Sequence, residues 1–221
     1  MALKVLPMSV YQQAAEKLRK AILSGLFKPG DRLTEASLCE RLGVSRPLIR
    51  EALRSLEAEK LITIVPNRGP IVPIISWQEA QEIYQVRAVL EGEAAASFAK
   101  RATPADIKTM REALKRFNTA NKTGNVFGRL NTTSQFYEVI LSGCGNRVIQ
   151  DILQGLVARI TFLRMRSMSK VGRATFSARE MKKILLAVEA GDAKAARSAA
   201  VQHVIQACEA ARLMYSEAAL D

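Results

Sequence analysis

The stretch that decides the fold is Thr34–Lys60, which reads TEASLCERLGVSRPLIREALRSLEAEK. It consists of a short amphipathic segment, a Gly-Val turn and a longer amphipathic segment. Gly43 can take the positive φ that lets one helix end and the next begin at a steep angle. Ser45 is the expected N-cap of the second helix, with its side-chain oxygen accepting a backbone N–H. The stretch therefore predicts a helix-turn-helix.

The second predicted helix has an apolar side and a cationic side. At about 100° per residue, one sector holds the apolar residues Ile49, Ala52, Leu53 and Leu56. Arg46, Arg50 and Arg54 line up beside that sector. Long cationic side chains near a helix N-terminus suit the major groove of DNA, where arginine can bind guanine or a phosphate. The alternative is an ordinary helical hairpin whose arginine face is solvated.

The flanking sequence favours DNA binding over that alternative. A first helix is predicted from Ser9 to about Ser24, followed by Gly25 and a connector with a Pro-Gly turn. After Lys60, two short β-branched or extended runs enclose turn residues and predict a two-stranded wing. The wing tip places Arg68 next to Gly69, where a cation can approach a minor groove.

Several short motifs in this region resemble the winged-helix domain of GntR-family transcription regulators. They are Pro29–Leu33, Leu42–Arg46, Arg50–Leu53 and Leu56–Glu59, and they span about the first third of the chain. The resemblance implies that five residues touch DNA: Ser45, Arg46, Arg50, Arg68 and Gly69. Arg54 joins this set from the arginine stripe. One departure is Pro47-Leu48, where the family more often has threonine followed by proline.

From Ser76 onward the pattern is helical throughout, and capping residues mark the helix starts. Six helices are predicted, over about 76–100, 103–121, 127–142, 146–169, 173–190 and 192–218. The expected fold is mainly α, with a winged helix-turn-helix over residues 1–75 and an all-α antiparallel six-helix bundle over residues 76–221.

The helical portion is similar to the effector domain of the FadR branch of the GntR family, called the FCD domain. The matching segments are Tyr84–Glu91, Gly145-Asn146 and Ala190–Asp192 with the helix that follows. The resemblance implies a homodimer that binds a double-stranded operator, expected to be an inverted repeat. It also implies a regulator, with repression as the expected mode, that responds to a small effector such as an organic acid.

Many members of that branch hold a divalent metal in the bundle through an aspartate and three histidines. The corresponding positions here are Thr133, Tyr137, Met181 and His203, of which only His203 is a good ligand. No metal or other cofactor is therefore expected. These four residues remain candidates for effector binding. For His203, a hydrogen-bonding role in the ligand pocket is favoured over the alternative of a satisfied helix residue.

An anionic effector without a metal needs another positive charge. Arg87 is the best candidate, but Glu91 lies four residues on and could simply pair with it. Arg159, Arg164 and Arg166 belong to a cationic helix, where most of them are expected on a solvated face.

The composition agrees with a nucleic-acid partner. The formal net charge is +12; residues 1–75 have 12 Lys and Arg against 7 Asp and Glu, and the remainder has 21 against 14.

No run of residues approaches a membrane span or a signal peptide, so a cytoplasmic protein without membrane contact is expected. The three dispersed cysteines argue against disulfides or a zinc ribbon. No recognisable catalytic constellation is present, so an enzyme is not expected. The alternative function is a non-specific architectural DNA-binding protein.

Overall fold

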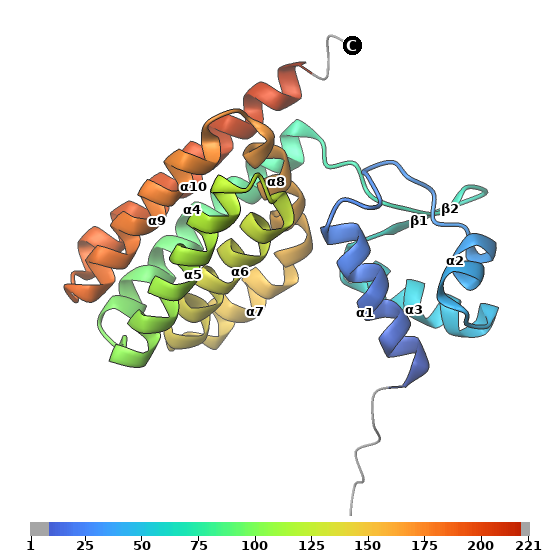
Figure 1. The fold of residues 1–221 in the computed structure, drawn as a ribbon, viewed down its shortest axis with the longest axis horizontal. Coiled ribbons are helices and arrows are strands. Elements are labelled where there is room, and N and C mark those ends of the chain that lie inside the picture. Colours follow the sequence, from blue (N-terminus) through green and yellow to red (C-terminus); the bar gives the residue numbers. More distant parts are fainter. Residues whose placement is uncertain (1–8, 218–221) are drawn as a thin grey trace, which may run out of the picture. The chain divides into compact units, whose positions relative to one another are not determined.

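The computed structural model describes residues 9–217, and the backbone contacts divide the chain into two compact units, Met1–Ile75 and Ser76–Asp221. Both units are mainly helical (Figure 1). Within the described residues, no helix is long and apolar enough to cross a membrane.

The first unit consists of three helices and a two-stranded sheet within the described residues (Figure 1). Its elements are α1 (Val10–Leu23), α2 (Glu35–Leu42), α3 (Arg46–Ala58), β1 (Thr63–Val65) and β2 (Gly69–Ile71). Helix α3 packs against both α1 and α2. Ile22, Leu38 and Ile49, one from each helix, are fully buried in the shared core. The predicted winged helix-turn-helix is confirmed.

The turn between α2 and α3 forms as the sequence predicts, apart from one hydrogen bond. Gly43 ends α2 with φ of 67°, and its N–H donates to the Cys39 carbonyl at 2.9 Å. Ser45 occupies the N-cap of α3, but its side chain accepts no capping hydrogen bond, so that detail of the prediction is wrong. Pro47 is the second residue of the helix and has no N–H, which removes one of the two donors that a capping side chain uses.

The wing is an antiparallel hairpin. Thr63 pairs with Ile71 and Val65 with Gly69. The turn places Asn67 and Gly69 at φ of 62° and 79°. A bridge between Arg32 and Ile71 adds the connector after α1 to the hairpin edge.

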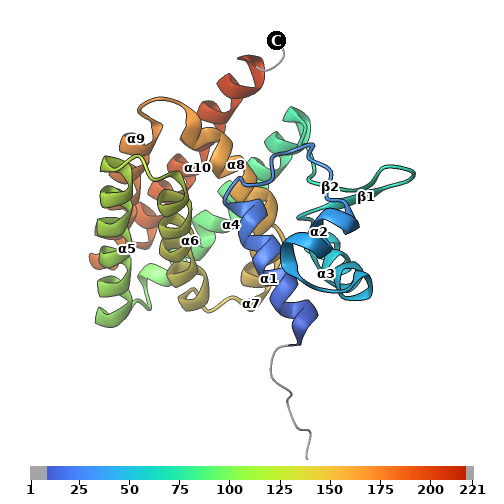
Figure 2. The ribbon, with the colours of Figure 1, turned by 45° about the vertical axis from the view of Figure 1, so that its right-hand side comes forward.

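The second unit is a helical bundle, so the predicted fold class is confirmed (Figures 1 and 2). Its helices are α4 (Trp77–Ala99), α5 (Pro104–Lys122), α6 (Val126–Gly143), α7 (Arg147–Gly155), α8 (Val157–Ser169), α9 (Arg173–Glu189) and α10 (Ala193–Glu217). Helix α4 packs against α10 and α6, and α5 packs against α6 and α9. The predicted end of the last helix, at about residue 218, lies outside the described residues.

The predicted fourth helix of the bundle, over 146–169, is two helices rather than one. Helix α7 ends at Gly155 and α8 begins at Val157, with Leu156 as the junction. The Leu156 N–H donates to the Leu153 carbonyl, three residues back, as in a tighter turn. Glycine is a poor helix former, which explains why the interruption falls at Gly155.

Candidate DNA-binding surface and ligand site

The exposed side of α3 begins with Ser45 and Arg46. Both side chains are exposed, and the Ser45 hydroxyl is not used as a cap. The Arg46 side chain makes no hydrogen bond or ion pair with any residue that the structure describes. A guanidinium in the first turn of this helix is thus available to a ligand, and the helix N-terminus beside it favours anions.

The other two arginines of the stripe are paired with carboxylates. The Arg50 Nε lies 2.9 Å from Oε1 and 3.0 Å from Oε2 of Glu35, at the start of α2. The Arg54 Nη1 lies 3.1 Å from Glu51 Oε1, within α3. Both arginine side chains are more than half exposed, so each pairing contributes little to stability and can be exchanged for a phosphate.

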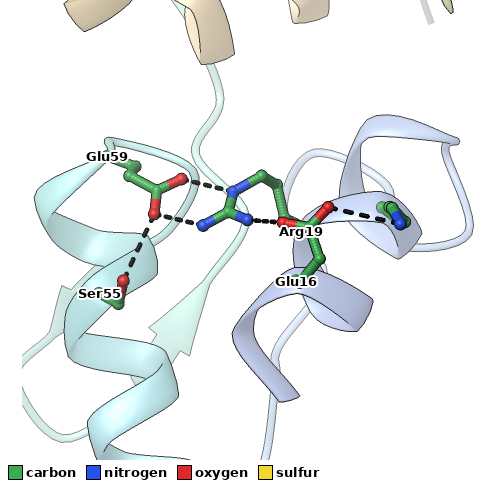
Figure 3. A network of polar contacts seen from close by, with 5 residues as sticks. Glu16, Arg19, Ser55 and Glu59 are labelled. Carbon is green, nitrogen blue, oxygen red and sulfur yellow. Dashed lines mark hydrogen bonds and ion pairs between the residues drawn. The ribbon is translucent and has the colours of Figure 1, made fainter. Parts of the chain in front are cut away.

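A network around Arg19 connects α1 to the C-terminal end of α3 (Figure 3). The Arg19 guanidinium donates to both carboxylate oxygens of Glu59, at 2.7 and 2.6 Å, and also pairs with Glu16. The Ser55 hydroxyl donates to Glu59 at 3.4 Å. A bidentate arginine–carboxylate pair fixes orientation as well as distance, so the network helps to hold α3 in place in the unit.

The wing tip carries the last DNA-binding candidates. The Arg68 N–H donates to the Val65 carbonyl at 3.1 Å in the wing turn, whereas its exposed side chain forms no hydrogen bond or ion pair within residues 9–217. Gly69 follows it with φ of 79°, a conformation that other residues rarely adopt. The geometry leaves the cation accessible.

The second site is a buried charged cluster in the helical unit, centred on Arg87. Arg87 and Glu91 are both on α4, are almost fully buried, and are joined by a 2.6 Å bond from Arg87 Nε to Glu91 Oε1. The predicted alternative of pairing with Glu91 is therefore observed. This ion pair leaves part of the hydrogen-bonding capacity of both side chains unused. Arg87 Nη1 and Nη2 and Glu91 Oε2 are buried without a hydrogen-bond partner.

Arg164 from α8 adds a second buried guanidinium to this cluster. Its side chain is only 7% exposed, so the expectation of a solvated face is wrong for this residue. It donates from Nη1 to the Ser134 hydroxyl at 3.3 Å and lies over the Tyr137 ring at 5.1 Å, while its Nε has no partner. Packing of α8 against α6 and α10 buries it, and the sequence contains no signal that separates it from Arg159 and Arg166.

Those two arginines lie in different surroundings. Arg159 pairs with Glu79 at 3.6 Å, and Arg166 lies over the Tyr215 ring at 3.7 Å and donates to the Met214 carbonyl. Both side chains are half-buried rather than fully solvated.

The charges in the cluster shift one another's pKa. Burial alone would raise the pKa of Glu91, but the Arg87 and Arg164 guanidiniums outweigh it and hold that pKa below its usual value. Burial, reinforced by the charge of Arg87, lowers the pKa of Arg164 to about 10. At neutral pH the cluster therefore has two positive charges against one negative charge.

Tyr137 and His203 border the cluster. Their ring centroids are 5.8 Å apart, and the buried Tyr137 hydroxyl has no hydrogen-bond partner. The His203 Nδ1 lies 2.7 Å from Glu180 Oε2, and Arg173 donates to both oxygens of Glu180. Burial lowers the pKa of His203 despite this carboxylate, so the ring is neutral at pH 7. Glu180 and Arg173 were not predicted as site residues.

Thr133 and Met181 are fully buried but are engaged elsewhere. The Thr133 hydroxyl donates to the Arg129 carbonyl at 2.8 Å, and the Ser177 hydroxyl lies 4.0 Å from the Met181 sulfur. A thioether, a phenol and a committed hydroxyl do not fit a divalent metal, and His203 alone cannot hold one tightly. Within residues 9–217 there is no group of three or more His, Cys, Asp or Glu side chains able to hold a metal ion.

We therefore predict that the purified protein carries no stoichiometric transition metal. A bound metal stabilises the folded state by mass action, so a chelator should leave the melting temperature unchanged. Elemental analysis and thermal melts with and without chelator are the measurements. About one equivalent of zinc, nickel or manganese per chain, lost together with stability on chelation, would contradict the prediction.

A cavity of about 60 Å³ adjoins the charged cluster. Its polar lining includes Glu91, Ser134, Tyr137 and Arg164, and its apolar lining includes Leu153 and Ile160. A cavity needs only about 10–15 Å³ of such space to hold one water, so this one has room for a small polar group such as a carboxylate.

Comparisons with known proteins find a family match for each of the two units. A family model described as the FCD domain matches residues 82–206, and one for the bacterial regulatory proteins of the gntR family matches residues 10–72. The chain is 28% identical over 204 residues to the HTH-type transcriptional regulator YdhC of Bacillus subtilis (strain 168), covering 92% of this chain and 91% of YdhC. It is 26% identical over 208 residues to the HTH-type transcriptional repressor RspR of Escherichia coli (strain K12), covering 94% and 91%.

The solved structure of E. coli McbR/YncC has the same fold, with a TM-score of 0.81 and 22% identity over 96% of this chain and 99% of that one. The FCD model alone spans more than half of the chain, and the gntR model covers most of the first unit. The chain therefore belongs to the GntR family of bacterial transcription regulators, as a member that carries an FCD domain.

Proposed function

We propose that this transcription regulator is a sequence-specific repressor whose helical unit binds a small organic anion. The observation that carries the proposal is the buried cluster of Arg87, Arg164 and Glu91, in which two guanidiniums face one carboxylate. Buried charges are normally paired and hydrogen-bonded, and this cluster leaves N–H donors of both arginines free. A carboxylate ligand would supply the missing charge and acceptors.

The DNA-binding role belongs to the first unit. In the proposal, Arg46, Arg50 and Ser45 enter the major groove with the first turns of α3, and Arg54 contacts the backbone. Arg68 and Gly69 approach the minor groove from the wing. The proposed repressor mode is supported by the similarity to RspR, whose name describes a repressor.

A single winged helix reads only a few base pairs, so we propose that a homodimer binds an inverted repeat. Footprinting on the DNA beside the protein's own gene tests this, with light scattering of the protein as the companion measurement. The proposal expects a protected inverted repeat and a mass of two chains. Uniform protection of any duplex would indicate an architectural DNA-binding protein instead, and a mass of one chain at micromolar concentration would contradict the dimer.

The proposed ligand site combines the cluster with the predicted effector residues. Arg87 and Arg164 would bind the anion, while the free Tyr137 hydroxyl can donate to it and Glu91 Oε2 can accept from a ligand hydroxyl or amine. His203 lies against Tyr137 as a neutral ring. Thr133 and Met181 would contribute to the walls.

A small carboxylate should raise the melting temperature of the protein, and Arg164→Met should remove the effect. A ligand at 100 times its Kd stabilises the folded state by about 2.7 kcal/mol, which corresponds to roughly 5–10 °C for a protein of this size. A thermal-shift screen of carboxylates is the measurement. Arg166→Met, on the same helix but outside the cluster, is the control and should keep the response. An equal response in the Arg164→Met variant would exclude this site.

A further inference from the structure

Helices α5 and α9 lie side by side in antiparallel orientation, and their shared outer surface is strongly basic. Two contacts fix the orientation. The Arg111 Nη2, in the first half of α5, lies 2.8 Å from Oε1 of Glu189, the last residue of α9. The Asn121 amide donates to the Thr175 hydroxyl at 3.3 Å, near the end of α5 and the start of α9. Residues in the middle of the two helices therefore face each other.

Most of the exposed cations of these two helices lie along the seam between them; Arg116 of α5 is also exposed but lies about 100° around the helix from Lys115. On α5 the other cations are three, four or seven residues apart, which places them on one side of the helix. On α9 the three cations lie within about one helical turn of one another. We call the set the α5/α9 cationic face, and it consists of Lys108, Arg111, Lys115, Lys122, Arg179, Lys182 and Lys183, all exposed. The first four fall within about 60° of one another around α5, on the side opposite the buried Ala113 and Phe117.

The face has a net positive charge that is large compared with that of the whole helical unit. Its seven cations are accompanied by two carboxylates, Glu112 and Glu189, which leaves an excess of five. Residues 76–221 as a whole have 21 Lys and Arg against 14 Asp and Glu, an excess of seven. Like charges at neighbouring positions repel one another, and a polyanion on this surface would relieve that repulsion.

We propose that the α5/α9 cationic face binds the phosphate backbone of duplex DNA outside the operator. Five of its seven cations are lysines, which are depleted in protein–protein interfaces but serve well as non-directional phosphate contacts. Once α3 and the wing hold the protein on DNA, neighbouring duplex is present at high effective concentration. The contact contributes affinity and salt dependence rather than sequence preference.

The test compares two full-length triple variants that lose the same charge. Lys115→Gln, Lys182→Gln and Lys183→Gln remove three cations from the face. Lys100→Gln, Lys170→Gln and Lys194→Gln remove three exposed lysines elsewhere in the unit. Each protein is titrated onto the footprinted operator alone and onto the operator with about 20 base pairs of unrelated sequence on either side, at several salt concentrations.

The proposal expects the flanks to tighten binding of the wild type and to steepen the dependence of log K on log salt. It expects the face variant to lose that gain, with a slope lower by about 2 to 3, since each phosphate contact contributes roughly 0.9. The control variant should behave as the wild type, and all three should bind the bare operator equally. Melting temperatures check that the variants fold.

The proposal is overturned if flanks give the wild type no gain, or if both variants lose it equally. If footprinting finds no specific site, the repressor proposal fails separately. In that case the wild type, the face variant and the control variant are compared on short and long duplexes of random sequence. On the long duplex, only the face variant should show a smaller dependence of log K on log salt than the wild type.

Discussion

Replacing Arg46 with alanine is expected to lower operator affinity about 10- to 100-fold while leaving the melting temperature unchanged. A base-edge contact from arginine contributes roughly 1–3 kcal/mol of discrimination. Arg46 is exposed and unpaired among the described residues, so it can contact DNA without first breaking an ion pair. Gel-shift titration against the operator and a random duplex measures both affinity and specificity.

Arg50→Ala should also weaken operator binding, but Arg50 must first leave Glu35. Lys17→Ala removes an exposed cation of α1, outside α3 and the wing, and is the matched control; it should change affinity by less than about twofold, because salt screens such a charge. Operator affinity that is unchanged in Arg46→Ala would remove α3 from the recognition role.

Glu91→Leu is expected to destabilise the protein by roughly 3–5 kcal/mol, because it leaves two buried guanidiniums without their carboxylate. For a chain of this size the melting temperature should fall by about 6–20 °C. Because the pKa of Glu91 is held below its usual value, its stabilisation is present above the pKa of an unfolded glutamate and is lost as the pH falls through the folded value. Thermal melts from pH 7 into the acid range measure both effects.

Two further variants test whether the loss of stability in Glu91→Leu comes from the buried charges. Glu93→Leu removes an exposed carboxylate of α4 that pairs with Arg197, and its effect should stay within about 1 kcal/mol. The double replacement of Arg87 and Glu91 by methionine and leucine should cost less than Glu91→Leu alone, since no unpaired Arg87 remains. A Glu91→Leu variant as stable as Glu93→Leu would show that the cluster charges are not buried in solution.

The local architecture could be predicted from the sequence because short-range rules determine it. The apolar period of α3, the positive φ of Gly43 and the turn at Gly69 all follow from neighbouring residues. The Ser45 hydrogen bond was predicted wrongly because Pro47 supplies no N–H. The break at Leu156 was missed because one glycine inside a helical pattern does not by itself end a helix.

The ligand cluster could be predicted only in part. Tyr137 follows from the resemblance to the family, Arg87 from the need for a cation on the apolar first helix of the bundle, and the pairing of Arg87 with Glu91 from their spacing. Arg164 was missed because its burial depends on the packing of α8 against helices that are distant in sequence. The bond between Glu180 and His203 joins residues 23 positions apart on two helices, and no local pattern indicates it.

The central claim is that an anion in the Arg87–Arg164 cluster controls operator binding. The most direct test is the operator Kd of the wild type and of Arg164→Met, each with and without the carboxylate that raises the melting temperature. The account predicts that the ligand changes the wild-type Kd by about 5- to 150-fold, the usual range for coupled sites, and leaves that of the variant unchanged. A ligand that stabilises the wild type but leaves its operator Kd unchanged would contradict the account.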